Sequence, residues 1–294
     1  MIEEKGFKYH LWNAILYIVL GLLSLAFLYP MVHVLMASFS DPSRLMAHQG
    51  LLLWPDGFSL EGYKVVLKNP NIFVGYQNTL IYVVCGTALN IFLTSLGAYV
   101  LSRRKLMFKK PLTFMIVFTM YFSGGLIPNF LLVQNLGLYD TRFALILPGA
   151  IATWNLIVMR TSFQQIPPSL EESARIDGAN DFVILFRIIL PVAKATVAVM
   201  VLFYAVGHWN SWFNAMIYLR KREYFPLQLF LREILIANSN AGNVFENTGD
   251  EGVFLLEELI KYCTIVVSTV PILCIYPMVQ KYFVKGVMMG SIKE

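Results

Sequence analysis

The sequence predicts an all-α membrane protein with six transmembrane helices, and three observations support this fold class. Of the 294 residues, 57% are hydrophobic and only 14% are charged. The mean hydropathy of +0.62 lies on the apolar side of ordinary globular proteins. A helix that crosses about 30 Å of hydrocarbon needs roughly 20 apolar residues. Apolar runs suited to this role occur at about residues 11–36, 80–101, 112–132, 143–159, 192–212 and 262–282.

The first and last runs have features of their own. Residues 11–36 are too long for the apolar region of a signal peptide, and the flank MIEEKGFKYH mixes acidic with basic side chains. We therefore expect this helix to be retained. In the sixth run, Pro271 and Pro277 are expected to kink or locally open the helix.

Basic residues predict the orientation, because short loops rich in Lys and Arg remain in the cytoplasm. The connection between the second and third runs, SRRKLMFKK, is crowded with them, whereas the connection after the third run offers only Arg142. Both termini and residues 167–191 are therefore expected in the cytoplasm. Residues 40–77, 137–142 and 213–261 are expected outside. Residues 213–261 also include basic residues, but the charge of a long loop has little influence on orientation.

A charged helical hairpin is predicted at residues 167–191, between the fourth and fifth runs. Two prolines at residues 167–168 end the preceding helix, and Ser169 is suited to cap a new one. Glu172, three residues later, completes the pattern of a capping box. Gly178 supplies the permissive residue that ends this helix, so the helix is expected to be short.

The second arm of the hairpin is predicted at residues 182–190. Asn180 or Asp181 can cap it, and Pro191 is expected to open the next apolar run. Two roles are compatible with such a hairpin. It can lie on the membrane surface as a solvated amphipathic element, or it can be bound by a cytoplasmic partner.

The segment EESARIDGANDFVILFRIILP closely resembles the signature of permease subunits of binding-protein-dependent ABC importers. That signature is EAA, three variable residues, Gly, nine variable residues, Ile, a variable residue, Leu and Pro. The matching positions are Glu172, Ser173, Ala174, Gly178, Ile188, Leu190 and Pro191. Ser173 departs from the usual alanine. The segments YPMVHVLMASFSDP, LGAYVLSRR, NLGLYDTRFALILP, FYAVGHWNSWF and QKYFVKGVMMGSIKE also resemble the carbohydrate importers related to the maltose permease.

The resemblance implies the type I ABC importer permease fold, with residues 1–294 as a single transmembrane domain. It also implies that the hairpin is a coupling element that docks on a cytoplasmic ATPase. The residues that would form this coupling site are Glu171, Glu172, Ser173, Ala174, Arg175, Asp177, Gly178 and Ala179. The C-terminal residues 286–293 are expected to reach the ATPase pair as well.

The chain itself is expected to bind neither ATP nor a metal and to have no catalytic residues. It lacks the GxxxxGK[ST] phosphate loop, the HExxH motif and the GxSxG motif. The three cysteines, Cys85, Cys263 and Cys274, are widely spaced inside apolar runs and support no disulfide framework. No basic stripe with interleaved aromatics indicates nucleic acid.

The resemblance implies an inner-membrane complex. Its other members would be a second permease subunit, two ATPase subunits that bind ATP and Mg, an extracytoplasmic solute-binding protein, and membrane lipid. The cargo would be a saccharide. The segment FSGGLIPNF at residues 122–130 and the GSIKE ending look most like oligosaccharide permeases, including those for alginate or galacturonan fragments.

A substrate path is predicted from aromatic and amide side chains in the fourth and fifth runs. Flat aromatic faces stack on sugar rings, and amides bond to hydroxyl groups. The candidates are Trp154, Asn155, Tyr204, His208, Trp209, Asn210 and Trp212. The alternative is that these aromatics form an interfacial belt and that Asn210 bonds to a neighbouring helix. The resemblance adds that the sugar site lies chiefly in the partner permease.

Two other classes of function remain open from the residues alone. An ion-driven carrier or a channel would act without an ATPase, but such a carrier needs ionisable residues deep in its spans, and this chain has almost none there. A membrane-embedded enzyme would need a catalytic constellation, and the sequence offers none.

Overall fold

The computed structural model describes residues 7–103, 106–239, 256, 258–274 and 277. The described residues are predominantly helical and include no strand, only an isolated β-bridge between Ser40 and Phe58. The prediction of an all-α fold is confirmed for this part of the chain. Two compact units are distinguished, Met1–Asn69 with Glu233–Thr269 and Pro70–Arg232 with Val270–Glu294.

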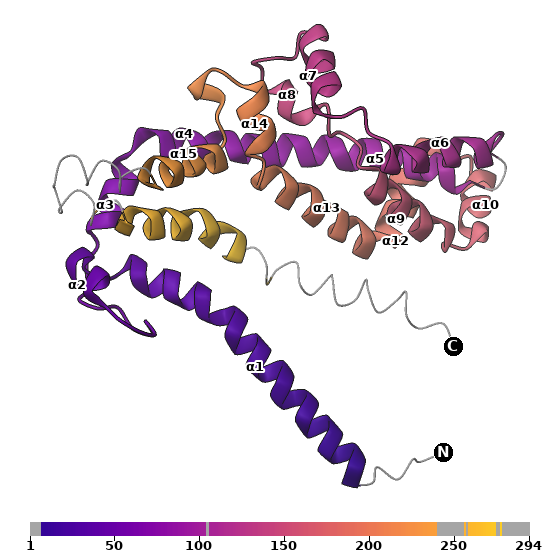
Figure 1. Cartoon of the computed structure of the whole chain (residues 1–294). Coiled ribbons are helices and arrows are strands. Elements are labelled where there is room, and N and C mark those ends of the chain that lie inside the picture. The colour runs from indigo at the N-terminus through magenta and orange to yellow at the C-terminus, as the bar shows by residue number, and fades with distance from the viewer. Residues whose placement is uncertain (1–6, 104–105, 240–255, 257, 275–276, 278–294) are drawn as a thin grey trace. The chain divides into compact units, whose positions relative to one another are not determined.

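The first unit begins with the long helix α1, Phe7–Ser38 (Figure 1). The span Tyr9–Ser38 has a mean hydropathy of 2.3, and none of its most apolar stretch is buried within the chain. A helix that is apolar on all sides is typical of a membrane span. The first predicted transmembrane helix is therefore present, with Pro30 inside it.

Short helices follow α1 in the first unit. Asp41 caps α2, Pro42–Ala47, by accepting hydrogen bonds from two backbone N–H groups of the first turn. Helix α3, Glu61–Lys68, packs closely on helical residues 258–269, because a Cβ at Gly62 would lie 2.6 Å from Sγ of Cys263.

The second unit is built on one continuous helix, Pro70–Ser102 (Figure 1). It consists of α4, Pro70–Ile81, a π-helical turn η1, Tyr82–Gly86, and α5, Thr87–Ser102. The helix begins ahead of the predicted residue 80.

The extra turns of α4 carry polar side chains that lower the local hydropathy. Asn78 and Thr79 are buried and bond to backbone groups of residues 223–227. The Nδ2 group of Asn78 donates to the carbonyl of Glu223 at 2.7 Å, and Oγ1 of Thr79 accepts from the N–H of Leu227 at 2.9 Å. The membrane-type pattern of α4 is therefore interrupted by side chains used for packing.

The third and fourth apolar runs are broken rather than straight. Helices α6, Lys109–Tyr121, and α7, Leu126–Asn135, meet at 113°. Gly125 lies at this break with φ +88°, a conformation that favours glycine. The fourth run is divided into α8, Phe143–Ile146, and α9, Thr153–Gln164. Hydropathy does not detect these breaks, although the Gly-Gly pair in FSGGLIP is a local turn signal.

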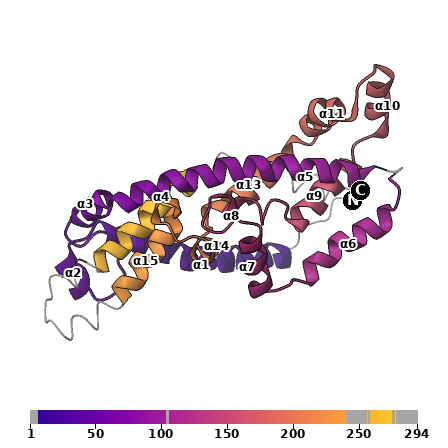
Figure 2. The same cartoon turned by 90° about the horizontal axis from the view of Figure 1, so that it is seen from above.

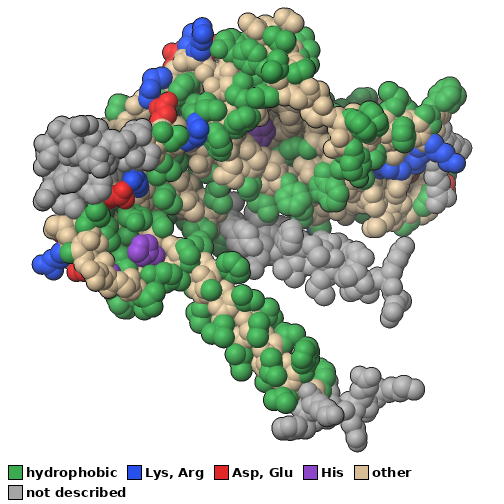
Figure 3. Space-filling view, in the orientation of Figure 1, with side chains coloured by type: hydrophobic (Ala, Val, Ile, Leu, Met, Phe, Trp, Pro, Cys, Tyr) green, Lys and Arg blue, Asp and Glu red, His purple; other side chains and the backbone are tan. Residues whose placement is uncertain are grey.

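The remaining helices of the second unit follow the hairpin. They are α13, Lys194–Trp209, α14, Phe213–Tyr218, the 3-10 turn η3, Arg222–Tyr224, and α15, Leu227–Ser239, which continues past Arg232. Close packing joins α5 to α9 and to α13. On the face shown in Figure 3, Lys and Arg gather where α5, α6 and α10 lie and again beside α14, whereas the surface between these two places is mostly hydrophobic or uncharged.

By length and composition, two helices of the described residues can cross a membrane, or up to four if each bent pair is one span. The count of six spans stays a prediction. The sixth run lies partly outside the described residues, and so does the C-terminal segment 286–293.

Candidate functional site

The first arm of the hairpin is helix α10, Pro168–Ile176, which projects with α11 beyond the end of α5 (Figure 2). The prediction that Ser169 caps this helix is wrong. The N-cap is Pro167, no side chain caps the first turn, and Ser169 lies inside the helix. The physical reason is that Pro168 is already suited to the first helical position by its fixed φ, so the helix starts earlier.

The end of α10 is closed by a Schellman motif. The N–H of Ala179 donates to the carbonyl of Ala174 at 2.9 Å, and the N–H of Gly178 donates to that of Arg175 at 3.1 Å. Gly178 has φ +82°, as this motif requires. The predicted end of the helix is confirmed, together with its glycine.

The second arm consists of α11, Asp181–Val183, a π-helical segment η2, Ile184–Ile189, and α12, Leu190–Val192. Oδ1 of Asn180 accepts from the N–H of Val183 at 2.9 Å, which confirms one of the two predicted caps. Pro191 lies inside α12 and does not open the next helix. The chain bends by 89° between α12 and α13, at Ala193.

The predicted coupling residues divide into inward and outward groups. Ala174 is buried in an apolar cluster with Leu185, and Glu171 is largely buried, with 16% of its side chain exposed. The exposed members are Glu172, Ser173, Arg175, Asp177 and Gly178, while Ala179 is half-buried. Ile176, next to them, is 87% exposed. The tip of the hairpin therefore presents an apolar side chain flanked by charges.

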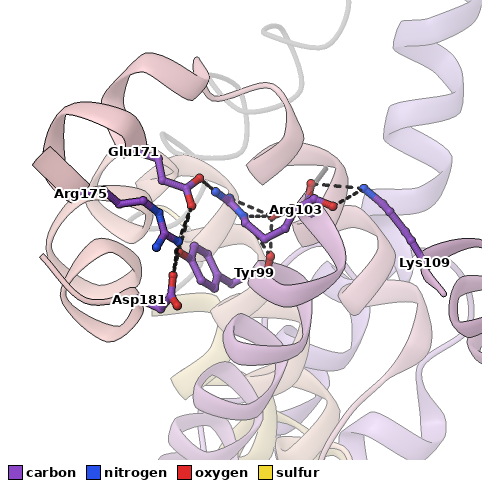
Figure 4. A network of polar contacts seen from close by, with 7 residues as sticks. Tyr99, Arg103, Lys109, Glu171, Arg175 and Asp181 are labelled. Carbon is purple, nitrogen blue, oxygen red and sulfur yellow. Dashed lines mark hydrogen bonds and ion pairs between the residues drawn. The ribbon is translucent and has the colours of Figure 1, made fainter. Parts of the chain in front are cut away.

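Five residues form a connected set, which we call the hairpin network (Figure 4). Glu171 pairs with Arg103 and with Arg175, the latter at 3.0 Å. Arg175 also pairs with Asp181. The hydroxyl of Tyr99 donates its single proton to Asp181 at 3.0 Å, and Glu171 is a second acceptor within reach at 3.4 Å. Two cations thus alternate with two anions.

The hairpin network joins the C-terminal end of α5. The guanidinium carbon of Arg103 lies 4.3 Å from the centre of the Tyr99 ring. Lys109 donates to the carbonyl of Arg103 at 2.9 Å, and Arg160 on α9 donates to that of Leu101 at 3.3 Å. Basic side chains at this position satisfy carbonyls that have no partner within the helix.

A cavity of about 970 Å³ lies between the hairpin and the end of α5. Arg103, Glu171 and Asp181 line its polar side, and Leu96 and Phe163 are among its apolar residues. None of the seven predicted substrate-path residues lines it.

Two of those seven, His208 and Tyr204, bond to side chains of α5. Tyr204 also bonds to the irregular segment between α8 and α9. Nδ2 of Asn90 donates to the carbonyls of Gly149 and Ala150, both at 2.8 Å. Oδ1 of Asn90 therefore faces His208, whose Nε2 lies 2.7 Å away and donates. These bonds satisfy irregular backbone in a predicted span, where water is scarce.

Tyr204 has a similar position one turn earlier. Its hydroxyl lies 2.7 Å from Oγ1 of Thr94 and accepts from the N–H of Ala152 at 3.1 Å. The hydroxyl of Tyr204 and Nε2 of His208 thus bond to other parts of the second unit in this conformation.

The other predicted path residues are dispersed. Trp209 is buried and makes an edge contact with Tyr76, and Asn155 is buried on α9. Trp154, Asn210 and Trp212 are exposed. The guanidinium carbon of Arg232 lies 4.4 Å from the centre of the Trp212 ring. The structure therefore does not gather the seven into one site.

Sequence reasoning missed the residues of α5 that contact these elements. Asn90 and Thr94 are four residues apart on one helix face, and Tyr99 follows nearer the end. Polar side chains at helical spacing in an apolar run were the available signal. Arg103 contributed only to the prediction of the membrane orientation, as one of the basic residues of its loop.

Comparisons with known proteins cover the central part of the chain in one case and nearly the whole chain in others. The pattern of the family "Binding-protein-dependent transport system inner membrane component" matches residues 96–213, which include the hairpin network and the hairpin. The polygalacturonan/rhamnogalacturonan transport system permease protein YtcP of Bacillus subtilis is 43% identical over 97% of this chain and 99% of its own length. The chain belongs to this family. It is therefore a transport subunit of an ATP-driven importer and not an enzyme, as predicted.

A second relative and a solved structure are also similar over most of their length. Protein LplC of Bacillus subtilis is 39% identical over 90% of this chain and 88% of its own length. A solved structure of a bacterial ABC transporter involved in the import of the acidic polysaccharide alginate matches with a TM-score of 0.85 and 32% identity. That match covers 95% of this chain and 98% of the other. The permease fold is thereby confirmed, and the chain is an inner membrane component.

Proposed function

We propose that this chain passes an acidic oligosaccharide across the inner membrane by alternating access, driven through the hairpin at residues 167–191. Residues 1–294 form one transmembrane domain with both termini in the cytoplasm. Two ATPase subunits bind ATP and Mg, a second permease completes the pathway, and a solute-binding protein delivers the saccharide from outside. Closure of the ATPases moves the hairpin, and the helices follow as rigid bodies.

The observation that carries this proposal is the construction of the hairpin tip. Helix α10 is short and closed by the Schellman motif at Gly178, so its end resists fraying. Ile176 is 87% exposed between Arg175 and Asp177. An exposed apolar side chain flanked by charges suits a groove in another subunit, where burial and charge-assisted bonds act together.

Cross-linking tests the docking directly. In a chain whose three cysteines are replaced by serine, Ile176→Cys labelled with a maleimide–benzophenone reagent is expected to cross-link to the ATPase on irradiation, in inverted membrane vesicles that contain the whole complex. The measured quantity is the fraction of permease in an adduct with the ATPase. Lys110→Cys, also exposed but on α6, is the matched control and should give far less adduct. No adduct at position 176 would refute docking by this tip.

An acidic cargo is supported by two relatives. The 43% identical protein is described as a polygalacturonan/rhamnogalacturonan permease, and the structural neighbour belongs to an alginate importer. Both descriptions name polymers that contain uronic acids, which carry carboxylates at neutral pH.

A fixed cationic loop gives this cargo further support. Arg220, Lys221 and Arg222 are exposed at consecutive positions after α14. Oδ1 of Asp140 accepts from the N–H groups of Arg220 and Lys221 at 2.9 and 3.0 Å, and these bonds, that of Lys221 first, lower the pKa of the Asp140 carboxyl. On the proposed orientation this loop faces outward, where clustered cations raise the local concentration of a polyanion.

Uptake competition tests the cargo. In proteoliposomes that contain the whole importer and its binding protein, unlabelled galacturonan oligosaccharides are expected to inhibit uptake of labelled galacturonan fragments. Neutral galactan fragments of equal length should inhibit at least about tenfold less, since loss of a charge-assisted bond is worth about 1.5 kcal/mol or more. Equal inhibition by the neutral series would overturn the acidic assignment and leave the coupling proposal intact.

A further inference from the structure

We propose that Arg103 and Tyr99 are positioning residues that transmit movement of the hairpin to α5 through the hairpin network. This inference rests on the proposed function, because it assigns the internal link behind the docking tip. Neither residue lies in the hairpin. The first follows α5 directly, and the second is in its last turn.

The placement of the network carries the inference. Glu171 lies in the first turn of α10, Asp181 is the first residue of α11, and Arg103 follows the last residue of α5. The hydroxyl of Tyr99 lies within hydrogen-bond reach of both carboxylates, and Figure 4 shows the five side chains converging from these three elements. The network therefore ties both arms of the hairpin to one end of the continuous helix Pro70–Ser102.

Two adjacent glutamates face different ways. Glu171 has 16% of its side chain exposed and pairs with Arg103, which is 23% exposed. Glu172 is exposed beside it. This division leaves Glu172 for a partner and keeps Glu171 for the internal link.

Burial makes the inner pair the stronger part of the network. Arg175 and Asp181 are 49% and 60% exposed, so water and salt screen their attraction. Arg103 and Glu171 are screened less, and removal of one partner leaves the other charge poorly solvated. Burial also lowers the pKa of the Arg103 guanidinium, but an arginine stays protonated at physiological pH. The charge of Arg103 is therefore kept at physiological pH.

The competing explanation is that apolar packing alone holds the hairpin. Ala174 packs in a cluster with Leu185 and Ile189, and this contact survives any change to the charges. The two explanations differ in one quantity. A purely structural network affects the amount of folded complex, whereas a transmitting network affects the number of saccharides imported for each ATP hydrolysed.

The experiment measures this ratio in proteoliposomes that contain the assembled importer with its binding protein and ATPase. Glu171→Gln and Arg103→Gln are each expected to lower the ratio at least about fivefold while ATP hydrolysis persists, the lower end of typical coupling effects. Tyr99→Phe, which keeps the ring, should lower it less. The double variant should be no worse than either single one, because the two residues act as one pair. Lys110→Gln removes a nearby exposed charge and is the control.

A covalent replacement separates the two explanations further. With the native cysteines changed to serine, Arg103→Cys and Glu171→Cys joined by a short bis-methanethiosulfonate reagent should recover the ratio, and reduction should lower it again. A ratio within twofold of the parent in Glu171→Gln, Arg103→Gln and Tyr99→Phe would overturn the inference. The inference would also be overturned if the ratio of the linked variant did not exceed that of the same variant after reduction. The Ile176→Cys adduct is scored in the same variants, so failure of docking is distinguished from failure of the internal link.

Discussion

Gly178→Val is expected to lower saccharide uptake at least about tenfold while the permease remains in the membrane. Gly178 has φ +82°, and no neighbouring atom lies within 4 Å of a Cβ built there. The effect therefore comes from the backbone alone. A β-branched residue is a strong outlier at this φ, and such strain costs about 1–3 kcal/mol. The cheapest relief is to open the turn between the two arms, which displaces the tip at Ile176.

The measurement is uptake by the assembled importer, with ATP hydrolysis and membrane abundance recorded in parallel. We expect at least a tenfold loss of uptake, since about 1.4 kcal/mol corresponds to tenfold. Gly137→Val is the matched control, because Gly137 also has positive φ and an open surrounding but lies after α7. Gly178→Asn should retain most uptake, since asparagine tolerates this conformation. Normal uptake by Gly178→Val would contradict a rigid hairpin.

Asn90→Leu is expected to destabilise the second unit more than any exposed substitution. Asn90 is fully buried and makes three side-chain hydrogen bonds, to the carbonyls of Gly149 and Ala150 and to Nε2 of His208. Leucine leaves all three partners unsatisfied. At about 0.6 kcal/mol for each bond within a membrane, the loss is about 2 kcal/mol.

The test is the thermal midpoint of the purified complex in mild detergent. A loss of about 2 kcal/mol corresponds to a decrease of about 3 °C for a chain of 294 residues. Asn214→Leu makes the same chemical change at an exposed position on α14 and should leave the midpoint nearly unchanged. A midpoint for Asn90→Leu equal to that of the control would show that these three bonds contribute no stability.

The hairpin was largely predictable because its signals are local. Gly178 and Asn180 each act within a few residues, and the structure has both in the expected roles. The start of α10 was misplaced because two consecutive prolines and Ser169 compete for the same position. The preference of proline for the first turn prevailed.

The contacts of the hairpin were not predictable, because they depend on residues far away in the chain. Nothing near Glu171 in sequence indicates that Arg103 is its partner, since the pair spans the third and fourth apolar runs. The same limit applies to Tyr204 and His208. Their chemistry suits a sugar, but whether they face a pathway or another helix is decided by α5. In the structure they bond to Thr94 and Asn90.

The π-helical turn at Tyr82–Gly86 has a consequence for comparing relatives of this chain. Such a turn holds one residue more than an α-helical turn, so the helix on either side of it keeps its facing. Deleting one residue there would leave a regular helix in which Asn78 and Asn90 still face their partners, whereas a deletion elsewhere in α5 would rotate one face by about 100°. Single-residue insertions and deletions in α4 and α5 should therefore be aligned inside this turn, where they leave both polar faces in place.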